Sequence, residues 1–534
     1  MALPELRPSQ DRYDMARDDL ESIIEFLKSS DAGKLAHSTL EDVLNERGRE
    51  LLRRLLQAHL DARGPGEAAT AVKGADGIER DTAKSHERGL ASIFGDVRVK
   101  RVGYGAEGVE SLHPLDAELN LPEELYSFGL RRRAAVEAAK GSFDETVESL
   151  ARQTGTQVPK RQVEQIVRRA AVDFDSFYAE RSPPKGARSA CVLVFTSDAK
   201  GVVMRRSDLR PSTRKAAEKK RHKLKSRLTK GEKRNAKRMA TVVAVYTTAP
   251  FVRTPHQIVR LLAPQNEPAP AKRPRPENKR VWASLVKEPE DVMAEGFAEA
   301  QKRDPRHLKT WVAVVDGNKD QLRSLRKLAK RNRVDLVIIL DFIHVCEYVW
   351  KASLAFHGED DPTREEWVRE RLLRILCGHT SDAAAGMRRS ATLRGLSRTT
   401  RKPVDTCANY LLNYSPLLRY DEYLAAGFPI ASGVIEGACR HLVKDRMDVT
   451  GARWSLAGAE AVLRLRALRS SGDFDEYWRF HEEHEYERNH AARYADGGCG
   501  SHPEHQAART ARRSGRSTSL IAGSQRSLRA RARN

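Results

Sequence analysis

Short apolar runs that end on an acidic residue constrain the fold of this chain more than any other feature. The run CVLVFTSD reaches Asp198, and the run TWVAVVDGN contains Asp316 directly after its apolar residues. Continuous apolar runs of this length, bounded by turn signals, are typical of strands buried within a sheet. Amphipathic helical segments separate the later runs, as in parallel crossover connections. We therefore predict an α/β fold built on a mixed sheet.

Five strands account for the apolar runs between residues 187 and 346. GVVMRRS follows the first run after AKG, which predicts a tight turn, and TVVAVYTT comes next. These three strands suit an antiparallel meander, whereas TWVAVVDGN and VDLVIIL suit parallel crossovers. The basic stretch RKAAEKKRHKLKSRLTKGEKRNAKR is either a solvated excursion or a contact to a DNA backbone. APQNEPAPAKRPRPENK is expected to be a proline-rich bridge before the next helix.

For the N-terminal part, the sequence predicts helices and one strand. Residues 1–66 form two helices whose leucine stripe is either core or an oligomerisation surface, and residues 67–182 form a DNA-binding region. GDVRVKRVGYG alternates as a half-exposed strand does. Residues 142–172 give two helices around TGT, which is either a helix-turn-helix or an ordinary helical hairpin. Three basic residues favour DNA contact by this pair: Arg161, Arg168 and Arg169.

The C-terminal part is predicted to be helical. Residues 347–428 show no strand pattern and form an all-helical insertion, and residues 429–490 complete the core. In ASGVIEGACRHLVKDRM we expect Ser432 to cap a helix that carries Glu436 in its early turns. Ser455 is expected to cap the following helix. Residues 491–534 are rich in arginine and poor in large apolar residues, which predicts a disordered basic tail.

The charge balance indicates a polyanionic partner. Lys and Arg total 95 against 73 Asp and Glu, a formal net charge of +22, and nucleic acid is the commonest such partner. No apolar run approaches membrane-spanning length, and the first residues lack the features of a signal peptide. We therefore expect a soluble intracellular protein. Six scattered cysteines without a CxxC pair argue against a zinc knuckle and a disulfide framework.

Three acids occur in an order typical of ribonuclease-H-like enzymes. Asp198 ends the first predicted strand, Asp316 ends the fourth, and Glu436 lies on a later helix. Carboxylates in such places can hold two Mg²⁺ or Mn²⁺ ions, which activate a nucleophile and stabilise a leaving oxygen at a phosphodiester. Each acid also has a simpler explanation. Asp198 and Asp316 suit turns, and Glu436 could pair with Arg440 one helical turn away.

Several segments resemble a known family. SDAKGVVM, VVDGN, DFIHVCEYVW and SGVIEGACRHLVKDRMDVTGARWSLAGAEAVLRLRALRSSGDFDEYW are similar to the ISKra-type transposases of bacterial insertion sequences. The last and longest segment is the most specific, and the similarity covers most of residues 90–490. The resemblance implies a DDE transposase, related to Mutator-like transposases, with a ribonuclease-H-like core and a helical insertion before the final glutamate. The arginine-rich tail falls outside it.

The resemblance also assigns roles to residues. It implies Asp198 and Glu436 as the first and last metal ligands. Asp316 is our choice for the second ligand, because it ends the fourth strand, where the fold places this ligand; Asp341 is the alternative. DFIH resembles the D/CxxH signature of Mutator-like transposases, which lies just downstream of the second acid. His344 in that motif would position the substrate together with Asp341, or would be a core histidine bonded to it. Four further residues are candidates for DNA contact: Arg440, Lys444, Arg446 and Trp454.

Trp454 has two explanations, stacking on an unpaired base or ordinary packing. The function that we expect is cleavage of DNA strands and their transfer at insertion-sequence ends. The partners implied are double-stranded DNA, both terminal inverted repeats and target, and further copies of this chain in a synaptic complex. The expected location is the bacterial cytoplasm, at the nucleoid. The alternatives are a DNA-binding protein without catalysis and a nuclease of the same fold that does not transfer strands.

Overall fold

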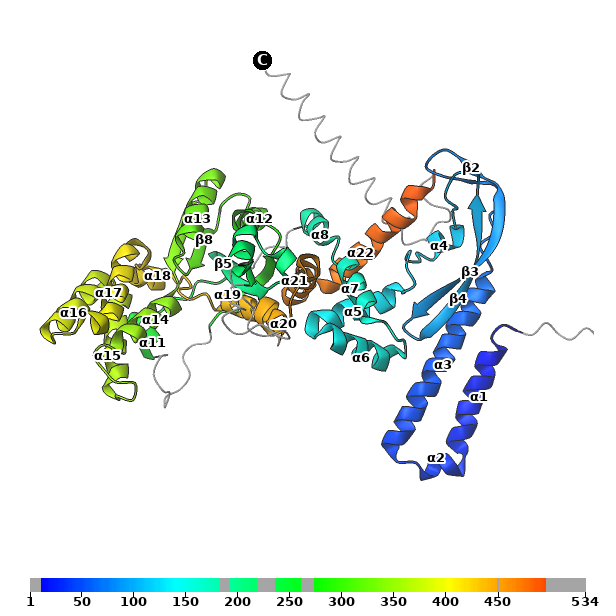
Figure 1. Cartoon of the computed structure of the whole chain (residues 1–534), viewed down its shortest axis with the longest axis horizontal. Helices are drawn as coiled ribbons and strands as arrows, with labels where there is room; N and C mark the ends of the chain where they lie inside the picture. The colour runs from blue at the N-terminus through cyan, green and yellow to red at the C-terminus, as the bar shows by residue number, and fades with distance from the viewer. Residues whose placement is uncertain (1–10, 183–191, 219–235, 261–272, 449–450, 496–534) are drawn as a thin grey trace, which may run out of the picture. The chain divides into compact units, whose positions relative to one another are not determined.

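The computed structural model describes residues 11–182, 192–218, 236–260, 273–448 and 451–495. By its internal contacts the chain forms two compact units (Figure 1). The N-terminal unit combines Met1–Asp173 with Trp478–Asn534, and the sheet unit is Phe174–Tyr477. The predicted basic tail lies outside the described residues from position 496 onward, as does most of the predicted basic excursion, residues 219–235.

The N-terminal unit is mainly helical and contains one long hairpin. Val97 and Val99 of this hairpin are buried while Arg98 and Lys100 are exposed, which confirms the half-exposed strand predicted here. The strands pair antiparallel from Thr82 with Gly105 to Ser92 with Gly95. The elements of its Met1–Asp173 part are α1 (Asp14–Lys28), α2 (Ser30–Lys34), α3 (His37–Arg63), β1 (Val72–Lys73), β2 (Glu79–Arg80), β3 (Thr82–Ser92), β4 (Gly95–Gly105), α4 (Pro114–Glu118), α5 (Phe128–Lys140), α6 (Phe143–Thr154) and α7 (Lys160–Arg169).

The helix pair predicted near residues 142–172 is present as α6 and α7. A capping box between Ser142 and Glu145 starts α6, because each side chain bonds to the other residue's backbone N–H. Gly155 ends this helix in the left-handed conformation, with φ of 71°. Two helices with a short turn are also what an ordinary hairpin shows, so the helix-turn-helix stays a prediction.

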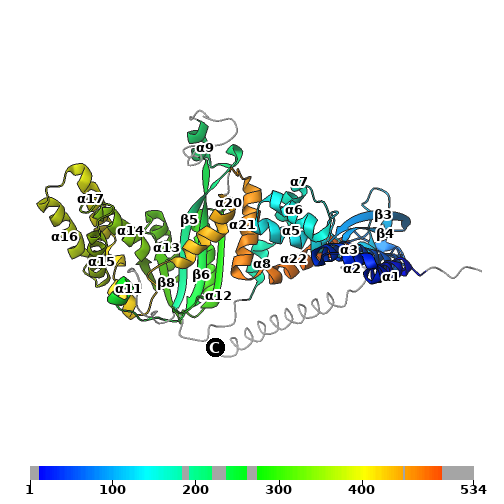
Figure 2. The ribbon, with the colours of Figure 1, turned by 90° about the horizontal axis from the view of Figure 1, so that it is seen from below.

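A five-stranded mixed sheet forms the centre of the sheet unit, in the order β7-β6-β5-β8-β9. β5 is parallel to β8, and β8 to β9, whereas β6 is antiparallel to both β5 and β7. The predicted mixed α/β sheet is thereby confirmed. Figure 2 shows its strands side by side, with α9 (Pro211–Glu218) beyond one end. The strands are β5 (Val192–Val203), β6 (Lys237–Thr248), β7 (Glu277–Ser284), β8 (Thr310–Val315) and β9 (Leu336–Leu340).

Two details of the strand prediction were wrong. The AKG stretch is no turn, because Ala199, Lys200 and Gly201 pair with β6 and continue β5 without a break to Val203. β6 is long enough to satisfy the backbone of all these residues, which removes the need for a hairpin. The fifth strand is instead β7, and it begins inside the stretch expected to be a proline-rich bridge. Its last four residues are buried and its first four are not. The apolar run of β7 is therefore too short to predict a strand from the sequence.

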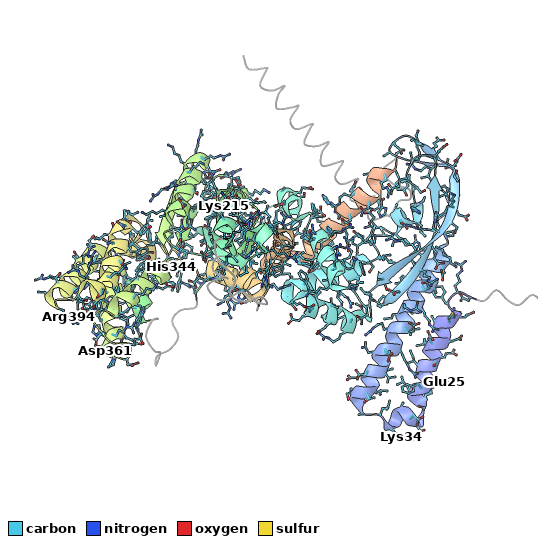
Figure 3. All side chains as sticks on the ribbon, viewed as in Figure 1. Glu25, Lys34, Lys215, His344, Asp361 and Arg394 are labelled. Carbon is cyan, nitrogen blue, oxygen red and sulfur yellow. The ribbon has the colours of Figure 1, made fainter. Side chains whose placement is uncertain are left out.

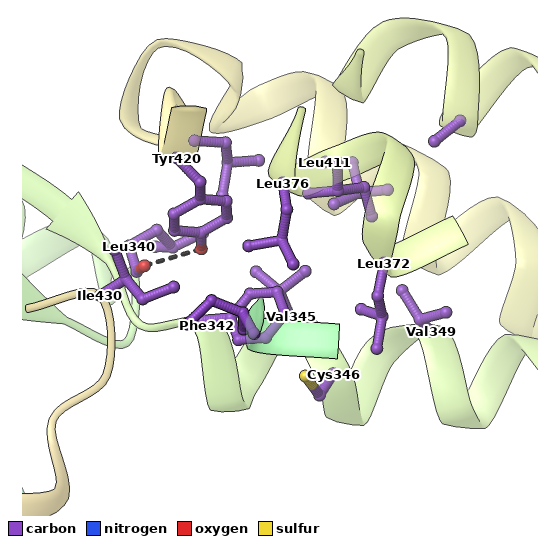
Figure 4. Close-up of a cluster of buried hydrophobic side chains, with 14 of the residues drawn as sticks. Leu340, Phe342, Val345, Cys346, Val349, Leu372, Leu376, Leu411, Tyr420 and Ile430 are labelled. Atoms are coloured by element: carbon purple, nitrogen blue, oxygen red, sulfur yellow. Dashed lines mark hydrogen bonds between the residues drawn. The ribbon is translucent and has the colours of Figure 1, made fainter. Parts of the chain in front are cut away.

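Helices cover both faces of the sheet. On one face, α12 (Pro289–Arg303) approaches closely at Gly296, where a Cβ atom would lie 2.4 Å from the Phe195 ring. On the other face, Val194, Val312 and Ile339 share a buried cluster with the helical insertion. Figure 4 shows part of this cluster, in which the Tyr420 hydroxyl donates to the Leu340 carbonyl at 2.8 Å. The sheet and the insertion therefore form one core.

The segment predicted as an all-helical insertion is helical throughout. It comprises most of α14 (Phe342–Ser353), then α15 (Thr363–Leu376), α16 (Thr380–Leu393), α17 (Arg398–Asn413), the short helix η2 (Ser415–Leu417) and α18 (Tyr420–Ala425). The remaining described elements are α8 (Phe174–Glu180), η1 (Arg206–Asp208), α11 (Pro255–Arg260), α13 (Lys319–Asn332), α19 (Gly433–Ala438), η3 (Cys439–Lys444), α20 (Asp445–Met447), α21 (Leu456–Ser471), α22 (Phe474–Asn489) and η4 (Ala491–Arg493). Within the described residues, no helix has the length and apolar character needed to cross a lipid bilayer.

Candidate acidic site at the sheet edge

Three aspartates occupy neighbouring positions across β5, β8 and β9, at the level where β8 and β9 end. Thr196 pairs with Val314, so Asp198 and Asp316 occupy equivalent positions two residues further along β5 and after β8. Val315 pairs with Leu340, which places Asp316 and Asp341 in step. Neighbouring strands lie about 4.8 Å apart. The acids therefore form a row that crosses the sheet where β8 and β9 end, near the side on which open α/β sheets bind their ligands.

Asp198 lies within a strand and not at its end, contrary to the prediction. It pairs with Val242 of β6, and β5 continues for five residues beyond it. Its Oδ1 accepts the backbone N–H of Ala199 at 2.6 Å, and its Oδ2 accepts the thiol of Cys439 at 3.2 Å. Pairing with β6 continues before and after Asp198 along β5 and fixes its backbone, so only the side chain can turn.

The helix that carries Glu436 is attached to the aspartates at both ends. Asp341 Oδ2 accepts the hydroxyl and, at 3.3 Å, the backbone N–H of Ser432. Cys439, which contacts Asp198, lies seven residues later. Because Ser432, Glu436 and Cys439 are spaced four and three apart, they lie on one helical face. Glu436 is therefore held on the side of the helix that faces both Asp198 and Asp341.

Ser432 was predicted to cap this helix, and that prediction was wrong. Its side chain makes no capping hydrogen bond and donates to Asp341. Donation by a hydroxyl to a buried carboxylate is a charge-assisted hydrogen bond, which is stronger than a bond between neutral groups. The predicted cap at Ser455 is confirmed, since this side chain accepts the N–H of Gly458. After Ala438 the helix widens into the π-helical η3, a distortion that is frequent at functional sites.

Glu436 lies in a negative electrostatic environment. Burial raises its pKa, the carboxylates of Asp341, Asp198 and Glu347 raise it further, and His344 opposes them. Within the described part of the chain Glu436 forms no ion pair, and Arg440 pairs with Asp445 at 3.5 Å. The simpler explanation of Glu436 as a partner of Arg440 is therefore wrong. His344 is half-buried and lies where the helical insertion meets the sheet (Figure 3).

Asp341 and Asp316 differ in their surroundings. Asp341 is 1% exposed, and its Oδ1 caps α14 by accepting the N–H of Ile343 at 2.9 Å. Asp316 is half-buried, and its Oδ1 accepts the N–H of Asn318 at 3.0 Å in the turn that sequence reasoning had considered. Its carbonyl accepts the Tyr410 hydroxyl at 3.3 Å. Asp341 thus stabilises the start of α14 and binds Ser432, which Asp316 does not do. The carboxylate of Asp316 is the more accessible of the two.

The carboxylates suit a hard divalent cation in chemistry but do not surround one point. Oxygen ligands and uncompensated negative charge are what Mg²⁺ requires. Among the residues that the structure describes, however, no three acidic, histidine or cysteine side chains converge as metal ligands do. Asp198 and Asp316 are turned toward neighbouring backbone N–H groups. Cation binding would exchange these local hydrogen bonds for bonds to the ion.

The residues predicted to contact DNA fall into two groups. Arg161, Arg168 and Arg169 are exposed on α7, where Arg169 pairs with Glu124. Arg440 and Lys444 are exposed near Glu436.

The remaining two predicted DNA contacts are buried. Arg446 is 4% exposed and Trp454 is 6% exposed, with the guanidinium carbon 4.7 Å from the indole ring centroid. The indole N–H donates to the Met447 carbonyl at 3.1 Å. Both residues were predicted to touch DNA; both are buried in this structure, and the DNA contact stays a prediction. Packing, the other explanation of Trp454, is what the structure has.

Sequence reasoning missed the residues that hold the acids in place. Ser432 and Cys439 anchor the Glu436 helix, and the hydroxyls of Tyr410 and Tyr414 donate to the carbonyls of Asp316 and Gly317. The four-and-three spacing around Glu436 was the available signal for the first pair. A search of known protein families found no match to this chain, and a search of curated proteins found no significant one.

We expect Glu436→Gln to stabilise the metal-free protein at pH 7 by less than about 1 kcal/mol, since solvent screens a partly exposed charge. The raised pKa means that the folded state favours the protonated carboxyl. The charged form therefore destabilises the fold as pH rises through that pKa, and the gain from glutamine is absent below the unfolded value of 4.5. Thermal unfolding between pH 4 and 8 measures this, with the exposed Glu148→Gln as control. An equal change of stability with pH in both variants would contradict the clustering of negative charge around Glu436.

Proposed function

We propose that this chain is a DDE transposase, a metal-dependent enzyme that cleaves and joins DNA strands through a ribonuclease-H-like core. The single observation that supports it best is the row of Asp198, Asp316 and Asp341, with Glu436 anchored over it by Ser432 and Cys439. The net charge of +22 fits a nucleic acid substrate. The resemblance of residues 197–204, 314–318 and 432–478 to ISKra-type transposases points to the same chemistry.

Asp198, Asp316 and Glu436 would hold the metal ions. Two bound Mg²⁺ or Mn²⁺ ions supply activation of a nucleophile and neutralisation of the leaving oxygen. In the first reaction a water oxygen bonds to phosphorus and the bond to the 3′ oxygen breaks. In the second, the freed 3′ hydroxyl attacks a phosphodiester of the target and displaces another 3′ oxygen. No covalent bond between protein and DNA is required.

Other residues of the site would position the reacting groups. Asp341 fixes the start of the Glu436 helix through Ser432, which is a positioning role. His344 shares the electrostatic environment of Glu436 and is half-buried, and its imidazole would donate to a phosphate oxygen. Arg440 and Lys444 are exposed on the turns after Glu436 and offer cations to the backbone. Arg161 and Arg168 on α7 would bind element ends by the same means.

The protein partners and location follow from this chemistry. Joining two element ends to one target requires both ends to be held together, so we propose that several copies act in one complex. Double-stranded DNA, both terminal repeats and target, is the substrate, and the bacterial nucleoid is where it would be met.

One observation favours a second candidate. The aspartate side chains are engaged in local hydrogen bonds, and the described acids do not converge. A DNA-binding descendant of a transposase without catalysis would have this arrangement permanently. A nuclease of the same fold, which cuts without joining, is a third candidate.

A cleavage assay separates the three functions. The purified full chain is incubated with a plasmid that carries the DNA flanking its own coding region, in Mg²⁺, in Mn²⁺ or in EDTA. A transposase produces cuts at the element ends and joined products in the metal buffers only. Cuts without joining would identify the nuclease. Binding of the ends with no cut in either metal would establish the non-catalytic protein.

A further inference from the structure

A polar cavity of about 660 Å³ lies in the N-terminal unit, and no residue of the acidic row lines it. It is bounded by β3, β4, the segment around α4, and the chain after α22. Its lining is unusually rich in cationic and imidazole side chains. The residues used below are Arg88, Arg101, His113, Asp116, His490 and Arg493.

The centre of this cavity has more positive than negative charge. Arg88 and Arg101 both pair with one oxygen, Oδ2 of Asp116, and the three side chains are only 11%, 18% and 10% exposed. Backbone carbonyls of residues 122–124 fix the Arg88 guanidinium further. Arg493 is balanced separately by the exposed Glu110 at 2.7 Å. Two buried cations thus share a single buried anion, which leaves one charge uncompensated.

Polar atoms at this centre also lack partners. Among the described residues, neither Oδ1 of Asp116 nor Nε of Arg101 has a hydrogen-bond partner. A buried polar atom without a partner costs roughly 1–3 kcal/mol. A ligand that accepts hydrogen bonds and carries negative charge would bond Nε of Arg101 and offset the positive charge. Oδ1 of Asp116 is an acceptor, so it would take a hydrogen bond only from a protonated oxygen of that ligand.

Burial and the surrounding positive charge lower the pKa values of the two histidines in this cavity, His113 and His490. Burial lowers the pKa of His113 to about 4, and Arg101, His86, Arg493 and Arg88 act in the same direction. Burial and Arg88 lower the pKa of Arg101 to about 10. His490 donates its Nε2 proton to the Leu121 carbonyl at 2.8 Å, and burial lowers its pKa. Besides Asp116, the exposed Glu123, which also lines the cavity, opposes this field at Arg88.

We propose that this cavity is a binding site for a phosphate group. Guanidinium groups bind phosphate through paired, charge-assisted hydrogen bonds, and Arg101 is placed to do so once it shares Asp116 with Arg88. A phosphate supplies the missing negative charge and several acceptor oxygens at once. The same chemistry is available in the backbone of duplex DNA and in a free phosphate or phosphate ester. The site is separate from the acidic row, and its existence does not depend on catalysis.

Calorimetric titration of the full chain with inorganic phosphate tests this proposal, with chloride at equal ionic strength as the reference. We expect measurable binding that Arg101→Gln weakens about tenfold or more, in line with the loss of a charge-assisted bond. Arg98→Gln is the matched control, since Arg98 lies on the same strand but is 78% exposed and pairs with Glu87. Asp116→Asn should bind phosphate more tightly, because it removes the competing anion.

Three results would overturn the phosphate site. They are an absence of phosphate binding by the wild type, equal binding by Arg101→Gln and wild type, and weaker binding by a folded Asp116→Asn variant. The opposite directions of the two variants separate binding from misfolding, and thermal unfolding of each confirms the fold. NMR titration of His113 gives a second readout, since bound phosphate should raise its pKa. Competition by duplex DNA identifies the backbone as the source of phosphate, and its absence identifies a free phosphate.

Discussion

Asp198→Asn should reduce metal-dependent DNA cleavage about a thousandfold or more, which corresponds to about 4 kcal/mol of transition-state free energy. The amide has the shape of the carboxylate, and its oxygen can still accept the Ala199 N–H. Only the bond from the Cys439 thiol, a weak donor, is lost, so the strand stays in place. It lacks the negative charge that a divalent cation requires. Affinity for end DNA should change less than about twofold, because the contacts to phosphate come from basic side chains.

Asp320→Asn is the matched control for this change. Asp320 is an aspartate of the same unit, on α13, with its side chain 85% exposed, and its replacement should leave cleavage intact. Glu436→Gln completes the test, because this variant is expected to be more stable than the wild type and yet inactive. A loss of activity with a gain in stability cannot come from misfolding. Full cleavage by both Asp198→Asn and Glu436→Gln would remove the metal site from the proposal.

The sheet shows which parts of the fold local sequence determines. Runs such as Val312–Val315 and Ile339–Leu340 are buried on both faces, so their composition alone predicts strands. Lys200 and Gly201 belong to a strand because β6 pairs with them, and pairing with a distant segment leaves no mark on the local sequence. β7 was missed for the same reason. Its exposed first half is a strand only through its pairing with β6.

The acids of the candidate site could be predicted from the sequence, but the contacts that hold them in place could not. Asp198, Asp316 and Glu436 could be chosen from their order along the chain, but their register depends on which strands are neighbours. The bond from Ser432 to Asp341 spans 91 positions, and no spacing rule connects the two. The burial of Arg446 and Trp454 was likewise hidden, because a Trp beside basic residues has the same sequence whether it faces DNA or the core.

Asp316→Asn and Asp341→Asn should have opposite effects, and this is the second large prediction. Asp316→Asn should lose cleavage about a thousandfold and keep its stability within about 0.5 kcal/mol, because an amide oxygen can still accept the Asn318 N–H. Asp341→Asn should lose about 1–3 kcal/mol of stability, because a buried amide cannot replace the carboxylate that binds Ser432 and caps α14. Chemical denaturation and cleavage assays on each variant measure both quantities.

The opposite pattern would exchange the two roles. If Asp341→Asn unfolds like the wild type but is inactive, while Asp316→Asn cuts DNA, Asp341 is the second metal ligand and Asp316 is a turn residue. Cleavage assays alone cannot decide this, since loss of the Ser432 anchor also displaces Glu436 and lowers activity.

Mg²⁺ titration of stability separates a ligand from an anchor. A cation that binds only the folded protein raises its stability by about 2.7 kcal/mol at a hundred times its dissociation constant. A variant that lacks a ligand loses this response, whereas a variant that lacks only an anchor starts from a lower stability and keeps most of the response. We expect Asp316→Asn to lose the Mg²⁺ response and Asp341→Asn to retain it. A retained response in Asp316→Asn, with Asp198→Asn unresponsive, would assign the metal to Asp198 and Asp341, the two residues that hold the Glu436 helix at its ends.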